Sequence, residues 1–246
     1  AWQGGMEGGL AAAELLAGMG SPSGKLPDTF AARLEDYPSS YNFHESDFYV
    51  DYTDDIYVGY RYFETIPGAL AKVNYPFGFG LSYTQFDWQV VSVSEKLGQL
   101  LVQVDLTNVG KRPGKEVLQV YGMAPQGKLG KSKRHLLVFE KSRLLQPGET
   151  QRLRLAWKME DMASYDENNA KAYVLEKGDY VISINSDSHT VLDQKTYTAD
   201  KDVVYKGENK RASDDTAATN VFEDAKGDVT YLSRADHFAN YEEATA

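Results

Sequence analysis

The first side chain in the sequence that could do chemistry is Glu7, which lies between pairs of glycines at positions 4–5 and 8–9. A carboxylate presented by a glycine-rich loop can act as a general acid or base. The same glycines could cradle a phosphate ahead of a helix, but neither a Gly-x-Gly-x-x-Gly spacing nor a closing Lys-Ser or Lys-Thr is present. We therefore interpret the glycines as a point of tight backbone approach.

Potential metal ligands occur in two groups. Asp51, Asp54 and Asp55 could supply the oxygen ligands that Ca²⁺ prefers, but their spacing matches no dedicated loop, so we favour a solvated turn. The histidines show no His-x-x-x-His or similar spacing, and they are His44, His135, His189 and His237. Asp236 precedes His237, and we interpret that pair as surface charge. The sequence thus predicts no metal site and no cofactor.

Aromatic side chains are unusually dense between residues 25 and 83. Examples are Tyr49, Tyr52, Tyr57, Tyr60, Tyr62 and Phe63. Because aromatic rings bury large areas without regular secondary structure, we expect an ordered connector that packs along a larger body. An alternative stays open, in which these rings stack on sugar faces and Arg61 orients hydroxyl groups at the rim of an active site.

A basic cluster lies between two of the expected strands. It consists of Lys128, Lys131, Lys133 and Arg134. Such a cluster could contact another domain or subunit, so a homo-oligomer stays open. We favour an exposed loop.

Composition narrows the partners of the chain. Its 246 residues carry a formal net charge of −10, which disfavours nucleic acid and anionic membrane surfaces. No apolar run approaches the roughly 20 residues of a membrane span. The sequence contains no cysteine, so there is no disulfide framework or thiolate site, and we expect a cytoplasmic location.

The elements that position these side chains change along the chain. Residues 6–17 are predicted to form a helix, because leucines and alanines recur at helical spacing and Gly18, Gly20 and Pro22 end it. From about residue 86 to 197 the period becomes two: apolar residues at 100, 102, 104 and 106 alternate with polar ones. The predicted strands are residues 88–93, 100–106, 117–121, 136–139, 153–157, 173–175 and 180–184. Seven short strands indicate an immunoglobulin-like or fibronectin type III-like sandwich.

Beyond about residue 199 the composition turns polar. The scattered apolar anchors are Val203, Val204, Tyr205, Val221, Phe222, Val229, Tyr231 and Leu232. We interpret this part as a linker or docking arm. Residues 236–244 could form one or two helical turns, whose thin apolar face would need a partner surface.

Several segments resemble glycoside hydrolase family 3, of the β-glucosidase type. The glycine-rich segment 4–9 and Ser21-Pro22-Ser23-Gly24-Lys25-Leu26-Pro27 resemble the end of that family's α/β sandwich domain. Residues 55–63 (DIYVGYRYF) and 75–84 (YPFGFGLSYT) resemble its connector into a fibronectin-like domain, and residues 147–150, 161–166 and 176–180 continue the match. Met6, Asp55 and Tyr173 depart from residues common in the family, and Asp55 weakens any role assigned to that position.

The resemblance implies a mainly β chain in four parts. These are the end of the α/β sandwich domain (1–30), an aromatic-rich connector (31–85), a seven-stranded fibronectin type III-like domain (86–198) and a linker or docking arm (199–246). The family's nucleophilic aspartate lies in a barrel and its acid/base glutamate lies upstream of Ala1. Glu7 comes after that acid/base position, so a structural role is favoured.

We therefore expect a non-catalytic accessory portion of a retaining β-glucosidase. Retaining hydrolysis needs two carboxyl groups about 5 to 5.5 Å apart, and the resemblance places both outside this chain. We expect no catalytic residue here, no assigned substrate-binding residue, and no activity of the chain alone. The expected partners are the missing barrel, the remainder of the α/β sandwich domain and, through them, a β-glucoside or oligosaccharide. The alternative is a stand-alone module that binds carbohydrate or protein.

Two further expectations concern the ends of the chain. It opens without an initiator Met, so we expect it to start inside a longer reading frame. The last fifty residues do not match the usual family ending. Some members resemble a permuted arrangement in which the barrel follows the sandwich, and residues 228–234 would suit a lead into such a barrel.

Overall fold

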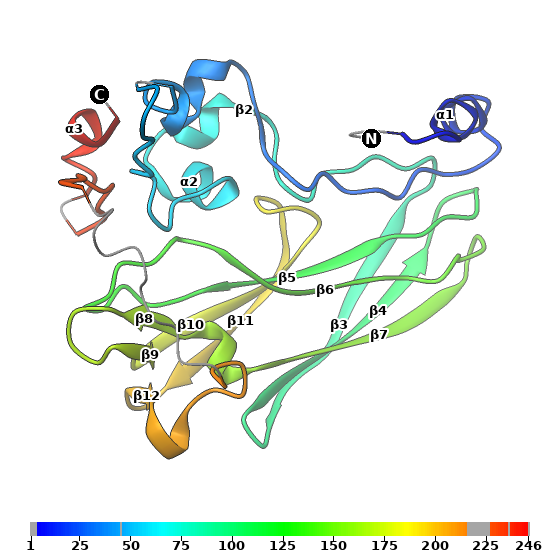
Figure 1. The fold of residues 1–246 in the computed structure, drawn as a ribbon. Coiled ribbons are helices and arrows are strands. Elements are labelled where there is room, and N and C mark those ends of the chain that lie inside the picture. The colour runs from blue at the N-terminus through cyan, green and yellow to red at the C-terminus, as the bar shows by residue number, and fades with distance from the viewer. Residues whose placement is uncertain (1–3, 45, 216–226, 236, 246) are drawn as a thin grey trace.

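The computed structural model describes residues 4–44, 46–215, 227–235 and 237–245, and strands dominate it (Figure 1). Two antiparallel sheets face each other, and a layer of short helices and loops lies along one side of them. The predicted mainly β sandwich is confirmed. No helix in the described ranges is long and apolar enough to cross a membrane.

The first sheet has the strand order β3-β4-β7, with β3 at Phe86–Lys96, β4 at Gln99–Asn108 and β7 at Thr150–Lys158. The apolar side chains at 100, 102, 104 and 106 of β4 are all at most 2% exposed, so the predicted alternation places them in the core. Leu97 and Gly98 join β3 to β4 and both have positive φ (52° and 74°), as the tight turn of a two-residue hairpin requires.

The second sheet has the order β11-β10-β5-β6. These strands are Val191–Ala199 (β11), Gly178–Asn185 (β10), Val117–Met123 (β5) and His135–Lys141 (β6). The inner faces of both sheets share one hydrophobic core, to which Leu118 of β5, Leu153 of β7 and Ile182 of β10 belong. Seven strands thus form the two facing sheets.

A third, small sheet corrects two predictions. It consists of β8 (Ser164–Asp166), β9 (Ala172–Leu175) and β12 (Val203–Tyr205), in the order β12-β9-β8. The predicted strand 173–175 exists but belongs here, and β11, which was not predicted as a strand, completes the seven. Residues 203–205 were interpreted as scattered anchors of a linker, but they pair with β9.

The segments before the sandwich contain short elements. Helix α1 covers Gly8–Leu16, within the predicted 6–17, and buries none of its residues. The connector holds β1 (Phe30–Ala31), which pairs with β2 (Val73–Tyr75), and helix α2 (Tyr60–Thr65). Turns of 3₁₀ helix are Leu34–Asp36, Pro38–Ser40 and Ala69–Lys72 in the connector, Met159–Met162 after β7 and Gly207–Asn209 after β12.

The connector and the C-terminal arm form a second core. Leu232, Phe238 and Ala244 of the arm are buried among connector side chains. Those connector residues are Tyr57, Tyr62, Phe63, Ile66 and Ala69. The arm ends in helix α3 (Tyr241–Thr245), so its apolar face has the partner surface that the sequence required. Val221, Phe222 and Asp236 lie outside the described residues.

The connector is fixed to the sandwich by a close approach at Gly78. The side chain of Gln119 in β5 donates to the carbonyl oxygens of Gly78 (3.1 Å) and Ser186 (2.8 Å). A Cβ on Gly78 would lie 2.1 Å from Gln119 Oε1, and Gly78 has a φ of 81°. Glycine is therefore required at this junction for space and for backbone conformation.

Candidate functional site

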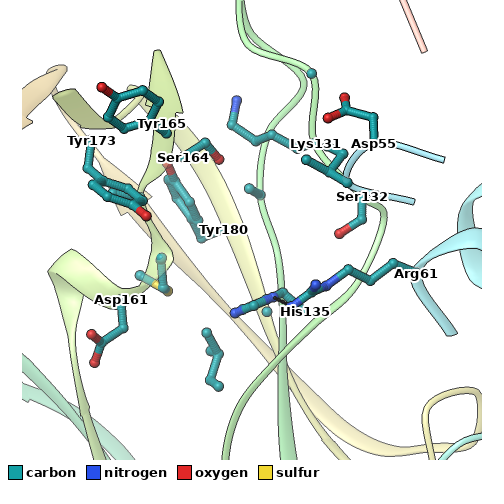
Figure 2. Close-up of a pocket in the computed structure, with 17 residues that line it drawn as sticks. Asp55, Arg61, Lys131, Ser132, His135, Asp161, Ser164, Tyr165, Tyr173 and Tyr180 are labelled. Carbon is teal, nitrogen blue, oxygen red and sulfur yellow. Dashed lines mark hydrogen bonds between the residues drawn. The ribbon is translucent and has the colours of Figure 1, made fainter. Parts of the chain in front are cut away.

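A pocket of about 480 Å³ opens between the connector, the β5–β6 loop and the third sheet (Figure 2). The connector contributes Asp55, Ile56 and Arg61 to its wall. The sandwich side supplies polar groups from residues 130–135 and 161–165, together with Tyr173 and Tyr180. Its volume lies within the range of small-molecule sites, roughly 300 to 1,000 Å³.

Arg61 and His135 meet across the junction between connector and sandwich. Arg61 Nη2 donates to His135 Nδ1 at 2.9 Å, which assigns the proton of a neutral imidazole to Nε2. Although part of His135 is exposed, burial of the imidazole and then the charge of Arg61 lower its pKa from 6.5 to about 4. His135 is therefore a neutral hydrogen-bond donor near pH 7.

The opposite wall carries Asp161, Ser164, Tyr165 and Tyr173. Asp161 follows β7, and one of its carboxylate oxygens accepts the amide of Lys158 (3.1 Å), which caps the 3₁₀ turn. The Tyr165 and Tyr173 rings meet edge to face with centroids 5.3 Å apart. The guanidinium of Arg211 lies 3.2 Å from the Tyr173 ring centre and so holds that ring in place.

A buried ion pair lies at the wall of the pocket, to which Lys131 belongs. Lys131 and Glu176 have side chains only 4% and 8% exposed and form a salt bridge. Burial alone would raise the pKa of Glu176, but hydrogen bonds from Lys131 Nζ and from the amides of Lys128 and Leu129 hold it below its usual range. Lys131 also donates to the carbonyl oxygens of Pro125 and Leu129, so its charge is fully used inside the fold.

These contacts correct the interpretation of the basic cluster as an exposed loop. Lys128 and Lys133 are exposed, but Lys131 and Arg134 are buried. Arg134 Nη1 donates to the carbonyl oxygens of Ser188 (2.5 Å) and His189 (2.8 Å) and lies 3.8 Å from Glu64 Oε2 of helix α2. The cluster therefore ties the β5–β6 loop to the β10–β11 turn and to the connector.

The aspartates of the connector do not meet at one point in a metal-binding arrangement, and the described residues contain no group of three metal-ligating side chains. Burial raises the pKa of Asp54, and Asp54 Oδ1 has no hydrogen-bond partner in the described structure. Burial also raises the pKa of Asp55, although a hydrogen bond from the Ile56 amide partly opposes this effect. The backbone of Asp55 has a positive φ of 49°. The backbone carbonyl of Asp51 accepts from Asn42 Nδ2 at 3.4 Å.

The other residues considered from the sequence are dispersed. Glu7 is exposed ahead of α1, and its backbone carbonyl accepts from the Ala11 amide at 3.0 Å. His189 Nδ1 lies 3.3 Å from Glu64 Oε2, and the rings of His44 and Phe43 lie 4.4 Å apart. His237 is exposed. Sequence reasoning did not find the pocket, because its residues come from four separate segments.

The pocket holds two carboxylates, but they do not face each other across one point. Figure 2 shows Asp55 and Asp161 on opposite sides of the pocket, with Arg61 on the same side as Asp55. A retaining glycosidase needs two carboxyl groups about 5 to 5.5 Å apart.

The fold therefore defines a β-sandwich domain joined to a docked connector and to an exposed N-terminal helix. Comparisons with known proteins identify the family. Residues 1–83 match the glycosyl hydrolase family 3 C-terminal domain, and residues 116–188 match a fibronectin type III-like domain. The chain belongs to glycoside hydrolase family 3 and represents a C-terminal portion of it.

Relatives with curated names support this assignment. β-Glucosidase A of Butyrivibrio fibrisolvens is 55% identical over 83% of this chain and 27% of its own length. A β-glucosidase of Ruminococcus albus is 41% identical over 97% of this chain and 25% of its own length. The chain thus spans about a quarter of these relatives. The 97% coverage extends the likeness through most of the C-terminal arm.

Solved structures show the same likeness. A β-glucosidase from Paenibacillus barengoltzii has a TM-score of 0.76 and 47% identity, over 81% of this chain and 23% of that one. β-Glucosidase 3B from Thermotoga neapolitana, solved in complex with α-D-glucose, has a TM-score of 0.74 and 38% identity, over 82% and 28%.

Proposed function

We propose that this chain is a non-catalytic accessory portion of a retaining family 3 β-glucosidase. The proposal rests on two family matches in this chain, at residues 1–83 and 116–188. The chain also spans only about a quarter of the length of the named relatives. In the complete enzyme, hydrolysis of terminal β-glycosidic bonds runs through a covalent glycosyl intermediate. Both reacting carboxylates belong to the barrel and to the rest of the α/β sandwich domain.

The exposure of apolar side chains on α1 supports this role. The helix buries none of its residues, and apolar side chains around it are highly exposed, including Met6 (98%) and Leu16 (84%). A short helix in water gains most of its stability from packing an apolar face. We propose that the remainder of the α/β sandwich domain covers α1, while the sandwich braces the catalytic domains. A stand-alone binding module has no need of such a helix.

Complementation tests the proposal. The purified chain is assayed with aryl β-glucosides alone, and then mixed with a polypeptide that carries the remaining part of the Butyrivibrio fibrisolvens enzyme. We expect no turnover by either piece and restored turnover in the mixture. Turnover by this chain alone would refute the non-catalytic role, and a mixture that assembles but stays inactive would refute the placement.

A further inference from the structure

We propose that the pocket between Arg61 and Tyr165 binds a neutral, polyhydroxylated small molecule, namely a mono- or disaccharide. The inference rests on the walls of the pocket and is independent of the proposed function. Four segments that are distant in the sequence, at residues 55–61, 122–137, 161–165 and 173–180, converge on one space of about 480 Å³. That space accommodates one or two sugar rings.

The charged groups of the wall favour a neutral ligand over an ionic one. The cation of Lys131 is paired with Glu176 and bonded to two backbone carbonyls, so it has no charge to offer the pocket. Arg61 remains as the cation of the wall, and Asp55 and Asp161 oppose it as anions. The two carboxylates disfavour an anion, and the half-buried Arg61 disfavours a cation.

The polar groups of the wall include both donors and acceptors. Arg61 uses one of its N–H groups on His135, and Figure 2 shows the second ring nitrogen of His135 directed toward the side where Asp161 lies. Among the described residues, Ser164 Oγ and Asp161 Oδ1 make no hydrogen bond, so they can accept from a ligand. Vicinal hydroxyl groups, each both donor and acceptor, match such a wall.

The apolar part of the pocket suits the C–H face of a sugar ring. Leu137, Met162 and the buried ring of Tyr180 line it, and Ala124 adds a methyl group. Tyr165 is 54% exposed at the rim, next to Tyr173, which Arg211 holds from its own side. An aromatic ring that is both preorganised and solvent-exposed is available to stack on a ligand.

The test is an amide NMR titration of the purified chain with D-glucose and cellobiose. D-Glucuronate and D-glucosamine serve as the charged comparisons. We expect saturable shifts confined to the residues around the pocket, with the neutral sugars binding more tightly than both charged ones. Shifts that do not saturate, that fall elsewhere on the chain, or that are strongest with a charged sugar would overturn the proposal.

Two variants locate the binding. Tyr165→Ala removes the rim ring, and Ser164→Ala removes one hydroxyl with little change of volume. Each is expected to weaken binding roughly fivefold, the usual effect of one aromatic contact or one hydrogen bond. Tyr52→Ala, at an 82% exposed tyrosine outside the pocket, is the matched control and should bind like the parent chain. If Tyr165→Ala does not fold, Ser164→Ala decides, and unchanged affinity in it refutes the site.

Discussion

At the scale of single residues, Arg61 orients His135 and helps to keep its imidazole neutral. The imidazole accepts from the guanidinium at 2.9 Å, and burial together with this cation lowers the pKa of His135 to about 4. In Arg61→Ala the cation is lost while the burial remains. We expect the His135 pKa to rise toward, without reaching, 6.5, as followed by the ring resonances in NMR.

Arg112→Ala is the control for that experiment, since Arg112 contacts Gly18 and Tyr83 rather than His135. A His135 midpoint that stays near 4 in Arg61→Ala would show that burial alone sets it. The lowered pKa of His135 also makes the stability of the fold depend on pH. The unfolded chain takes up a proton near pH 6.5, whereas folded His135 does so only near pH 4, so the contribution of this residue to stability falls as the pH drops through that window.

The buried pair of Lys131 and Glu176 leads to a second prediction. Lys131→Met leaves the Glu176 carboxylate buried with only the two amides of Lys128 and Leu129 as partners. Removing one member of a buried pair typically costs about 3 to 5 kcal/mol. We expect a loss of that order in the free energy of unfolding, measured by urea denaturation at neutral pH.

Lys128→Met is the matched control, because Lys128 is exposed and only its backbone amide reaches Glu176. It should unfold within about 0.5 kcal/mol of the parent chain. If both variants lose the same stability, the pair does not carry the effect.

At the scale of elements, the C-terminal arm supplies apolar side chains to the hydrophobic core of the connector. Leu232 is 2% exposed, and its backbone amide donates to the carbonyl of Thr53 at 2.9 Å. Tyr241 and Tyr62 share a hydrogen bond of 2.8 Å between their hydroxyl groups, and Arg234 donates to the carbonyl of Lys131. The arm thus packs on the connector and also touches the β5–β6 loop.

We therefore expect Leu232→Ala to destabilise the connector by about 2 to 5 kcal/mol, the usual cost of deleting a buried leucine side chain. Hydrogen exchange resolves the effect, with faster exchange at α2 and unchanged exchange in β4. Leu81→Ala, at a leucine that is 72% exposed, is the control. Equal exchange in both variants would show that the connector core is complete without the arm.

The elements that the sequence predicted well are those with a one-sided burial pattern. Strand β4 alternates strictly because one face meets the core, so its residues and their orientation could be predicted. Strand β11 lies at a sheet edge and is mostly exposed, which removes the alternation that would have revealed it. Strand β12 is only three residues long, and its partner β9 lies far back in the sequence.

The candidate site was harder to predict for a different reason. Arg61 was recognised as a group that could orient hydroxyl groups, but its partner His135 is 74 positions away. Lys131 and Glu176 are 45 positions apart, so nothing local distinguishes a buried lysine from the exposed Lys128 and Lys133. The domain bounds, the lack of catalytic residues and the cytoplasmic location stay predictions.

At the scale of the whole molecule, the exposed face of α1 leads to a prediction for assembly. Leu10 (59% exposed) and Leu16 (84%) make little contact within this chain. The double variant Leu10→Glu, Leu16→Glu should therefore unfold like the parent chain. In the complementation mixture it should fail to co-sediment with the missing portion, because two buried, unpaired carboxylates oppose docking.

Leu97→Glu is the control for this test, since Leu97 is 94% exposed at the tip of the β3–β4 hairpin. It should assemble like the parent chain. Normal co-sedimentation of the α1 variant would mean that another surface carries the contact.

The C-terminal end of α1 is fastened to the sandwich by two side chains. Tyr83 Oη donates to the carbonyl of Leu15 at 2.9 Å, and Arg112, in the turn after β4, donates to the carbonyl of Gly18 at 3.0 Å. The Arg112 guanidinium also lies 5.9 Å from the Tyr83 ring centre. Because these contacts join the end of the helix to the β4–β5 turn, a displacement of the helix by a neighbouring domain would also displace that turn and the sheet strands beside it.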